Sequence, residues 1–318
     1  MDTPALNLRI TLRQLVYFVA AAETGSVKLA AERVHISQPS ISAAIAHLEQ
    51  ELGLQLFVRH HAQGLSLTPA GMELLREVKA LLRGAEQLRV AAGALANELT
   101  GPLDVGCLLT LAPIIIPEVS YTFEQRHPKV RIRMTEGDQQ VLLDRLCTAE
   151  ISVAITYDLA VPSDMCFEPL AQLPPYAYVA ADHPLASRGS VSLRELAPEP
   201  LVLLDLPLSR DYFLSLFHDK HLVPNVCKVS SSMEVVRSLV ARGYGYSVAN
   251  FRPVNMTSLD GKPLAYLAID DDARPLYLGI LTLKGVRHTR VAYEFIEHCR
   301  ALIRNDSIPG MTTLGSRP

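Results

Sequence analysis

The sequence is poor in cysteine and lacks long apolar runs. Its 318 residues include five cysteines, which are odd in number, far apart and without a CxxC pair. This usage favours reduced thiols over a disulfide framework or a structural zinc site. No stretch approaches the roughly 18 uninterrupted apolar residues of a membrane span, and the N-terminus lacks the basic start and apolar core of a secretory signal. We therefore expect a cytoplasmic protein.

The sequence also has no large excess of charge, glycine or proline. The net charge of −3 excludes a histone-like polycation but leaves room for a local DNA-binding face. The hydrophobic fraction of 49% argues against a disordered chain. The 17 glycines and 21 prolines are too few for a collagenous one. Because one core seldom holds so long a chain, we expect two or three domains.

Residues 1–67 show three short helical patterns. The first is an amphipathic stripe that stops at Gly25, and Ser26 is the expected N-cap of the second. Ser37 is the expected N-cap of the third, with Pro39 in its first turn and Gly53 after its end. This order is the outline of a helix-turn-helix. The predicted buried stripes are Leu12, Leu15, Val16 and Val19 in the first helix and Ile41, Ile45, Leu48 and Leu52 in the third.

Residues 68–100 read as one long helix with Thr68 as its N-cap. Its apolar positions alternate spacings of four and three without a slip, as in a coiled coil. The pattern predicts a dimerisation helix, and the alternative is a single amphipathic helix lying on its own domain. The positions are Leu74, Val78, Leu81, Ala85, Leu88, Ala92, Leu95 and Leu99.

From residue 101 onward, apolar strands alternate with helical patterns, which predicts α/β units with mainly parallel sheets. The residues after 304 form an expected flexible tail (305–318). Strands are expected at 103–108, 130–134, 152–156, 177–180, 201–204, 245–249 and 276–281, and helices at about 114–126, 138–148, 210–218, 231–242 and 289–304.

The segment LRQLVYFVAAAETGSVKLAAERVHISQPSISAAIAHLEQELGLQLFVRHHAQGLSLTPAG resembles the winged helix-turn-helix of LysR-type transcriptional regulators. The later segments LDVGCLLTLAPIIIPEV, HPKVRIRMTEGD, ADHPLA and LVARGYGYS are similar to the effector domain of that family. The resemblance implies a winged helix-turn-helix (1–67), a linker and dimerisation helix (68–100), and a two-lobed Rossmann-like, periplasmic-binding-protein-like effector domain (101–304). Lobe I would hold about 101–171 and 273–304, and lobe II about 172–272.

The implied function is sequence-specific, effector-modulated transcriptional regulation. Its implied partners are promoter DNA, a small-molecule effector, RNA polymerase and further copies of the chain, as a dimer or a dimer of dimers. The rival interpretation is an enzyme or solute-binding protein built on the same two-lobed domain.

The buried stripe of the third helix leaves the start of that helix free to enter a major groove. Gln38 can pair with adenine, Ser42 with several base edges, and the Pro39 ring suits a thymine methyl group. Ala43 stands where the family often has arginine. The alternative is a capped, solvated helix face. By resemblance, the DNA-binding candidates are Ser26, Lys28, Ser37, Gln38, Pro39, Ser40, Ser42, Ala43, Arg59, His60 and His61.

Charge in this region comes from placement, because residues 1–70 hold five basic and five acidic side chains. Arg59 would reach phosphate from the wing, while Ser26 and Lys28 would contact the DNA backbone from the second helix. His60 and His61 stand where family wings often carry a further basic residue, so part of the wing charge would depend on pH.

Three expected helix starts follow strands and could point into one cleft, at Thr110, at Ser209–Arg210 and at Ser231. They predict a small carboxylate as effector. Plain capping is the alternative for each, and Arg210 could instead pair with Asp205 or Asp211. The effector candidates are Leu109, Thr110, Pro207, Ser209, Arg210, Ser231 and Ser232.

Signals for catalysis are incomplete. The segment 245–249 lacks the last glycine of a nucleophile elbow, and Gly243-Tyr244-Gly245 lacks the third glycine of a dinucleotide loop. His60-His61 is not metal-ligand spacing, and Cys227 has no cysteine close in sequence. We expect no enzyme activity, cofactor, metal or redox switch.

Overall fold

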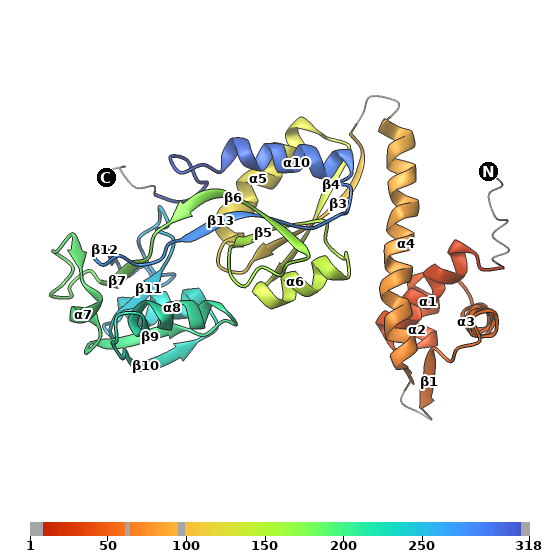
Figure 1. The fold of residues 1–318 in the computed structure, drawn as a ribbon, viewed down its shortest axis with the longest axis horizontal. Coiled ribbons are helices and arrows are strands. Elements are labelled where there is room, and N and C mark those ends of the chain that lie inside the picture. Colours follow the sequence, from red (N-terminus) through yellow and green to blue (C-terminus); the bar gives the residue numbers. More distant parts are fainter. Residues whose placement is uncertain (1–8, 61–63, 95–98, 313–318) are drawn as a thin grey trace. The chain divides into compact units, whose positions relative to one another are not determined.

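The computed structural model describes residues 9–60, 64–94 and 99–312 (Figure 1). The chain divides into two compact units, Met1–Ala96 and Asn97–Pro318. Among the described helices, none combines the length and the apolar character that a membrane crossing requires.

The first unit contains the expected helix-turn-helix followed by a two-stranded hairpin. Gly25 and Gly53 adopt left-handed backbone conformations and end the first and third helices, and the Ser26 hydroxyl caps the second. Thr68 accepts a 3.0 Å hydrogen bond from the N–H of Gly71 and so caps the long helix. The elements are α1 (Leu12–Thr24), α2 (Val27–Arg33), α3 (Gln38–Leu52), β1 (Phe57–His60), β2 (Gly64–Leu67) and α4 (Pro69–Ala94).

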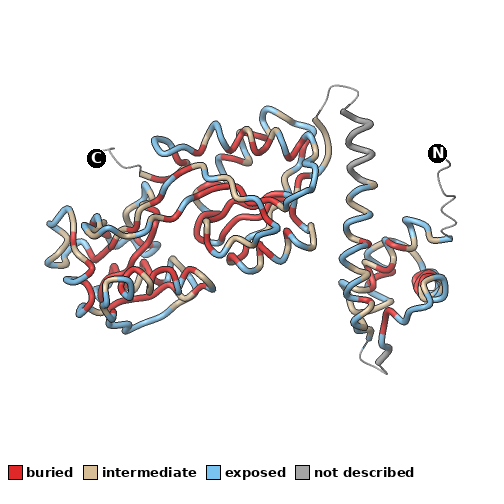
Figure 2. The backbone as a smooth tube through the Cα atoms, viewed as in Figure 1, coloured by how far each residue is buried: buried red, intermediate tan, exposed pale blue. Residues whose placement is uncertain are grey.

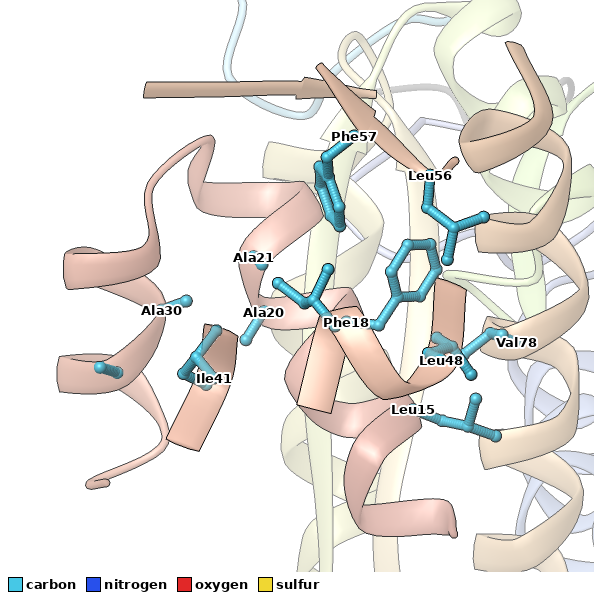
Figure 3. Packing of buried hydrophobic residues seen from close by; sticks show 12 residues of the cluster. Leu15, Phe18, Ala20, Ala21, Ala30, Ile41, Leu48, Leu56, Phe57 and Val78 are labelled. Carbon is cyan, nitrogen blue, oxygen red and sulfur yellow. The ribbon is translucent and has the colours of Figure 1, made fainter. Parts of the chain in front are cut away.

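One apolar core holds this unit together (Figures 2 and 3). Phe18 of α1 contacts Phe57 of β1 edge to face, with ring centroids 5.5 Å apart. The predicted stripe of α3 is confirmed at its buried positions Ile41, Ile45 and Leu48. The stripe of α1 is confirmed at Leu15 and wrong at Leu12 and Val16, which are exposed, because Phe18 is the residue that joins Leu15 in the core.

The apolar face of α4 divides between two environments. Val78 is only 3% exposed and belongs to the core, and Leu74 packs beside it, as the single-domain alternative predicts. Leu81, at the next position of the same pattern, is 55% exposed. Leu99 lies beyond the helix, which ends at Ala94. The expected positions 88, 92 and 95 lie outside the described residues or side chains.

Two groups of strands define two lobes in the second unit. Lobe I is a five-stranded sheet in the order β4 (Val130–Gly137), β3 (Gly101–Leu108), β5 (Val153–Tyr157), β13 (Leu276–Leu283), β6 (Met165–Leu173). Lobe II has a four-stranded sheet in the order β11 (Ser247–Ala249), β7 (Tyr176–Ala180), β12 (Leu264–Ile269), β8 (Ser190–Val191), and a parallel pair of β10 (Asn225–Ser230) with β9 (Pro200–Leu204).

Helices cover these sheets. In Figure 1, α5 and α10 lie together on one face of the lobe I sheet, where Phe123 contacts Phe295, and α6 lies on the other face. The helices are α5 (Ala112–Arg126), α6 (Gln139–Cys147), α7 (Leu193–Leu196), α8 (Ser209–His218), α9 (Met233–Ala241) and α10 (Arg290–Leu302).

All seven expected strands are present, but the prediction of mainly parallel sheets is wrong. β3 runs parallel to β4 and β5, whereas β13 runs antiparallel to β5 and β6, and β7 runs antiparallel to β11 and β12. The chain leaves lobe I after β6 and returns through β13 from lobe II, so it enters the first sheet from the opposite end. The exposed strand β10 lacks a buried apolar pattern and was not expected.

The chain after α10 is hydrogen-bonded as far as Thr312. Gly310 accepts a bond from the N–H of Val254, and the N–H of Thr312 donates to Arg252. The side chain of Asn305 accepts a 2.7 Å hydrogen bond from the N–H of Gln172. The expected flexible tail therefore does not begin at residue 305, and positions 313–318 lie outside the described residues.

Candidate functional site

The start of α3 presents a polar face to solvent. Gln38, Pro39, Ser40 and Ala43 are exposed and Ser42 is partly exposed, while the opposite side of the helix is buried. Ser37 stands at the N-cap position, as expected, but its hydroxyl lies 2.8 Å from that of Ser40 and makes no capping bond to the backbone. The helix is therefore started by backbone geometry and by Pro39 in its first turn.

The hairpin β1–β2 is joined to the turn that precedes α2. The N–H of Leu65 donates a 2.7 Å hydrogen bond to the carbonyl oxygen of Gly25. A Cβ at Gly64 would lie 2.4 Å from that same oxygen, so glycine is required for this approach. Arg59 pairs with Leu65 in the strand register. His61 and the side chains of Arg59 and His60 lie outside the described part of the chain.

Charged side chains hold the helices of this unit in place. The Glu49 carboxylate of α3 accepts hydrogen bonds from the N–H groups of Leu56 (2.8 Å) and Phe57 (3.2 Å), which ties α3 to β1. Glu23 of α1 pairs with Arg33 at 2.6 Å and with Lys79 at 3.0 Å. These contacts hold α3 against the first strand of the hairpin and join α1 to the end of α2 and to α4.

The start of α2 carries one side chain that caps the helix and one that is exposed. The hydroxyl oxygen of Ser26 accepts a 3.4 Å bond from the N–H of Leu29, so it caps the helix. Lys28, two residues on, is exposed.

A cavity of about 670 Å³ lies in the second unit between the two lobes. Lobe I contributes the connection from β3 to α5 and the first turn of α5, and lobe II contributes Leu206 beyond the end of β9, the start of α9 and the segment between β11 and β12. The lining residues are Leu109, Thr110, Pro113, Ile114, Leu206, Ser231, Ser232, Met233, Glu234, Arg237, Phe251, Pro253, Val254, Asn255, Thr257, Leu259 and Gly310.

Four of the seven expected effector residues line this cavity: Leu109, Thr110, Ser231 and Ser232. Pro207, Ser209 and Arg210, at the start of α8, are not among the lining residues. Arg210 pairs with Asp205 (3.2 Å) and Asp211 (3.5 Å), which was the alternative for this residue. The three helix starts therefore do not share one cavity.

The helix starts also differ in detail from the expected ones. Thr110 precedes α5 by two residues, and its hydroxyl is hydrogen-bonded to Tyr157. The N-cap of α9 is Ser232, whose hydroxyl accepts a 3.4 Å bond from the N–H of Val235, so the expected cap at Ser231 is wrong by one residue.

Arg237 was not expected at this cavity. Its side chain is only 4% exposed, and it donates to the Tyr266 hydroxyl and to the carbonyl oxygens of Asn255 (2.9 Å) and Thr257 (2.7 Å). Burial raises the pKa of Tyr266 to about 12, so this phenol stays neutral. The spacing of Glu234 and Arg237 on an amphipathic helix was the available signal, because residues three apart share a helix face.

The groups that could carry catalysis or redox chemistry are dispersed. Among residues 9–60, 64–94 and 99–312, no three His, Cys, Asp or Glu side chains gather as a metal site would require. Burial raises the pKa of the Cys107 and Cys299 thiols. Cys227 is exposed and donates to the carbonyl oxygen of Leu201. Ser247, in the incomplete elbow motif, is buried in β11.

Both units match models of known protein families. Residues 12–72 match the model "Bacterial regulatory helix-turn-helix protein, lysR family", and residues 96–304 match "LysR substrate binding domain". The DNA-binding transcriptional dual regulator OxyR of Escherichia coli is 31% identical over 241 residues, which cover 75% of this chain and 78% of that protein. The regulator YvbU of Bacillus subtilis is 28% identical over 300 residues, which cover 92% of this chain and 99% of that protein.

Solved structures are also similar. A LysR family regulator from Pseudomonas aeruginosa, the PA01 protein, is 36% identical, with a TM-score of 0.62, and the match covers 92% of this chain and 99% of that one. The complex of full-length CbnR with its target DNA has a TM-score of 0.65 at 23% identity, with coverage of 92% and 99%, and supports the fold alone.

Proposed function

The chain belongs to the LysR family of bacterial transcriptional regulators, and on that premise we propose which of its residues contact DNA and effector. As a member, it is a DNA-binding regulator whose activity is modulated by effector binding, and not an enzyme. The comparisons give the enzyme or solute-binding alternative no support. The division into 1–67, 68–100 and 101–304 is part of the proposal.

The start of α3 reads bases in the major groove. The observation that carries this assignment is the exposed face formed by Gln38, Pro39, Ser40 and Ala43, with Ser42 partly exposed beside them, opposite the buried stripe of the same helix. Gln38 donates and accepts at an adenine edge, and Ser42 contacts a neighbouring base. Ser37 contributes its hydroxyl at the N-cap of α3, next to the DNA backbone.

The hairpin and α2 hold the DNA backbone. Arg59, His60 and His61 of the wing and Lys28 of α2 supply positive charge, and the Ser26 end of α2 supplies a helix N-terminus. The bond from Leu65 to Gly25 supports this assignment because it ties the wing to the start of α2.

The exposed part of α4 joins copies of the chain. Leu81 continues an apolar pattern that the domain core does not cover, and a second α4 would bury it. Each copy would then place one α3 on a promoter half-site. RNA polymerase would be a further partner of the DNA-bound protein.

The cavity between the lobes binds the effector. Thr110 and Leu109 from lobe I face Ser231 and Ser232 from lobe II across it. A ligand that prefers one spacing of the lobes shifts the population toward that state, and the shift changes DNA affinity. The small carboxylate expected from the sequence depended on three helix starts that share one cleft, and the start of α8 with Arg210 is not among the residues that line this cavity.

A binding measurement with the full chain tests this function. A labelled fragment of the DNA upstream of its own gene is titrated with protein, next to a scrambled fragment of equal length and composition. We expect binding to the upstream fragment at least about a thousandfold tighter than to the scrambled one. Equal affinities for the two fragments would contradict sequence-specific binding.

A further inference from the structure

We propose that the cavity between the lobes takes an apolar ligand with a protonated amine that pairs with Glu234, rather than a carboxylate. The inference rests on the proposed role of this cavity and specifies the chemical class of its ligand. Of the described residues around the cavity, two carry charge, Glu234 and Arg237. Their side chains differ in exposure, because Arg237 is buried while Glu234 is exposed.

The positively charged guanidinium of Arg237 is buried and already hydrogen-bonded. Its guanidinium is held by the Tyr266 hydroxyl and by the carbonyl oxygens of Asn255 and Thr257. With 4% of the side chain exposed, a ligand carboxylate could reach this group only by displacing these acceptors. Leaving buried carbonyl oxygens without donors is costly.

The negative charge of Glu234 is accessible. The side chain is 48% exposed, and one of its carboxylate oxygens lies 3.7 Å from Nε of Arg237. That separation exceeds a hydrogen bond, so both carboxylate oxygens keep acceptor capacity. A cationic ligand head can donate to this carboxylate in a charge-assisted bond, whereas a ligand carboxylate would meet like charge.

Four of the other polar side chains of the lining already make hydrogen bonds, while Ser231 offers an exposed, uncharged hydroxyl. Asn255 accepts from the N–H (3.0 Å) and the hydroxyl (2.6 Å) of Thr257. Ser232 caps α9, and the Thr110 hydroxyl is bonded to Tyr157. Of the two charged side chains among the described lining residues, Glu234 is therefore the one open to a ligand.

Two N–H groups near the start of α9 already have acceptors at Ser232. The N–H of Val235 bonds to the Ser232 hydroxyl, and the N–H of Val236 bonds to the Ser232 carbonyl. Glu234 itself lies in the first turn and supplies the negative charge that a helix N-terminus favours.

Most of the remaining wall is apolar and suits a hydrocarbon or aryl body. Leu109 and Ile114 come from lobe I, and Leu206, Met233 and Phe251 from lobe II. A ligand that touches both sets buries apolar surface only when the lobes are together, which couples ligand affinity to lobe spacing.

Matched probes test this proposal on the full-length protein. Calorimetric titrations use 2-phenylethylamine, 2-phenylethanol and phenylacetate, and then hexylamine, hexanol and hexanoate, at neutral pH. Because one charge-assisted bond distinguishes the members of a set, we expect each amine to bind about tenfold more tightly than its alcohol and its acid. In Glu234→Gln the amine should lose that advantage, while alcohol affinity stays unchanged.

Asp211→Asn is the matched control, because Asp211 also lies in the first turn of a helix, α8, but not at the cavity. It should leave all affinities unchanged. Alcohols that bind as tightly as the amines, or amine affinity that survives Glu234→Gln, overturn the ligand class while the cavity remains the effector site. If none of the six probes binds, both the ligand class and the proposed role of the cavity are wrong.

Discussion

The N–H of Leu65 lies 2.7 Å from the carbonyl oxygen of Gly25, and this bond joins the wing to the turn before α2. Two segments that the proposed function places on the DNA backbone thus share a rigid connection. Their spacing is set by the protein before DNA is bound, so little ordering entropy is lost on binding.

Gln38→Ala and Ser42→Ala should each weaken binding to the upstream DNA by roughly 1–3 kcal/mol and leave affinity for random DNA unchanged. Gln38 is exposed at the start of α3, so its removal does not disturb the core. Fluorescence anisotropy at fixed salt measures both affinities. Equal losses on specific and random DNA would show that these residues do not read bases.

Leu81→Asp should dissociate the oligomer by placing charge in the α4 seam, and it should abolish operator binding. The domain should still fold, because Leu81 is 55% exposed. Met72→Asp is the control, since Met72 has the same exposure on α4 but lies off the seam. Sedimentation velocity measures the oligomeric state, and a Leu81→Asp protein that stays oligomeric contradicts the assignment of α4.

Gly71→Ala should destabilise the first unit by about 1–3 kcal/mol, as overpacking commonly does. A Cβ there would lie 2.2 Å from the carbonyl oxygen of Leu56 and 3.0 Å from the Leu67 side chain. Gly84→Ala on the same helix meets no atom within 4 Å and should stabilise it by up to about 1 kcal/mol. Urea unfolding followed by circular dichroism measures both, and equal midpoints would refute the steric argument.

His298 should make the second unit less stable in acid. Burial, and then the charge of Arg126, lower the pKa of His298, whose ring nitrogens contact the Thr122 hydroxyl at 2.8 Å and the Arg126 guanidinium at 3.4 Å. The unfolded chain therefore binds the proton more readily. The contribution of neutral His298 to the free energy of unfolding is fully present above the pKa of histidine in the unfolded chain, about 6.5. It is lost as pH drops from there toward the lower pKa of the folded state.

Calorimetric melting of the full chain between pH 8 and pH 5 measures this effect. His298→Gln should flatten the pH dependence of the melting temperature, while His218→Gln, at an exposed position, should not. An unchanged slope in the His298 variant would rule out this histidine as the titrating group.

Operator affinity should rise from pH 8 to pH 6, and its salt dependence should steepen. Histidine charges near its usual pKa of about 6.5, and a phosphate contact by His60 or His61 would favour the charged form. Affinity is then highest below the free pKa and declines as pH rises through the bound one. Binding isotherms of the wild type and a His60→Gln/His61→Gln protein, at two salt concentrations, compare the slopes, and identical pH dependence would make these histidines bystanders.

The local features of this protein could be predicted from sequence because neighbouring residues determine them. The end of α1, the start of α2 and both ends of α3 follow from Gly25, Ser26, Pro39 and Gly53, which act on the backbone beside them. The exposed face of α3 follows from the period of its buried residues. The wing hairpin followed only from the resemblance, since its short strands carry little pattern.

The features that tertiary structure decided depend on residues far apart in the chain. An apolar pattern shows that a face of α4 is buried, but only packing shows that Val78 meets its own domain while Leu81 remains exposed. The direction of β13 depends on where the chain crosses back from lobe II. The Arg237 guanidinium is already bonded to oxygen atoms of Asn255, Thr257 and Tyr266, which lie 18 to 29 residues away, so it is not open to an anion. Sequence spacing does not encode which acceptors reach a guanidinium first, because the folded chain alone brings them together.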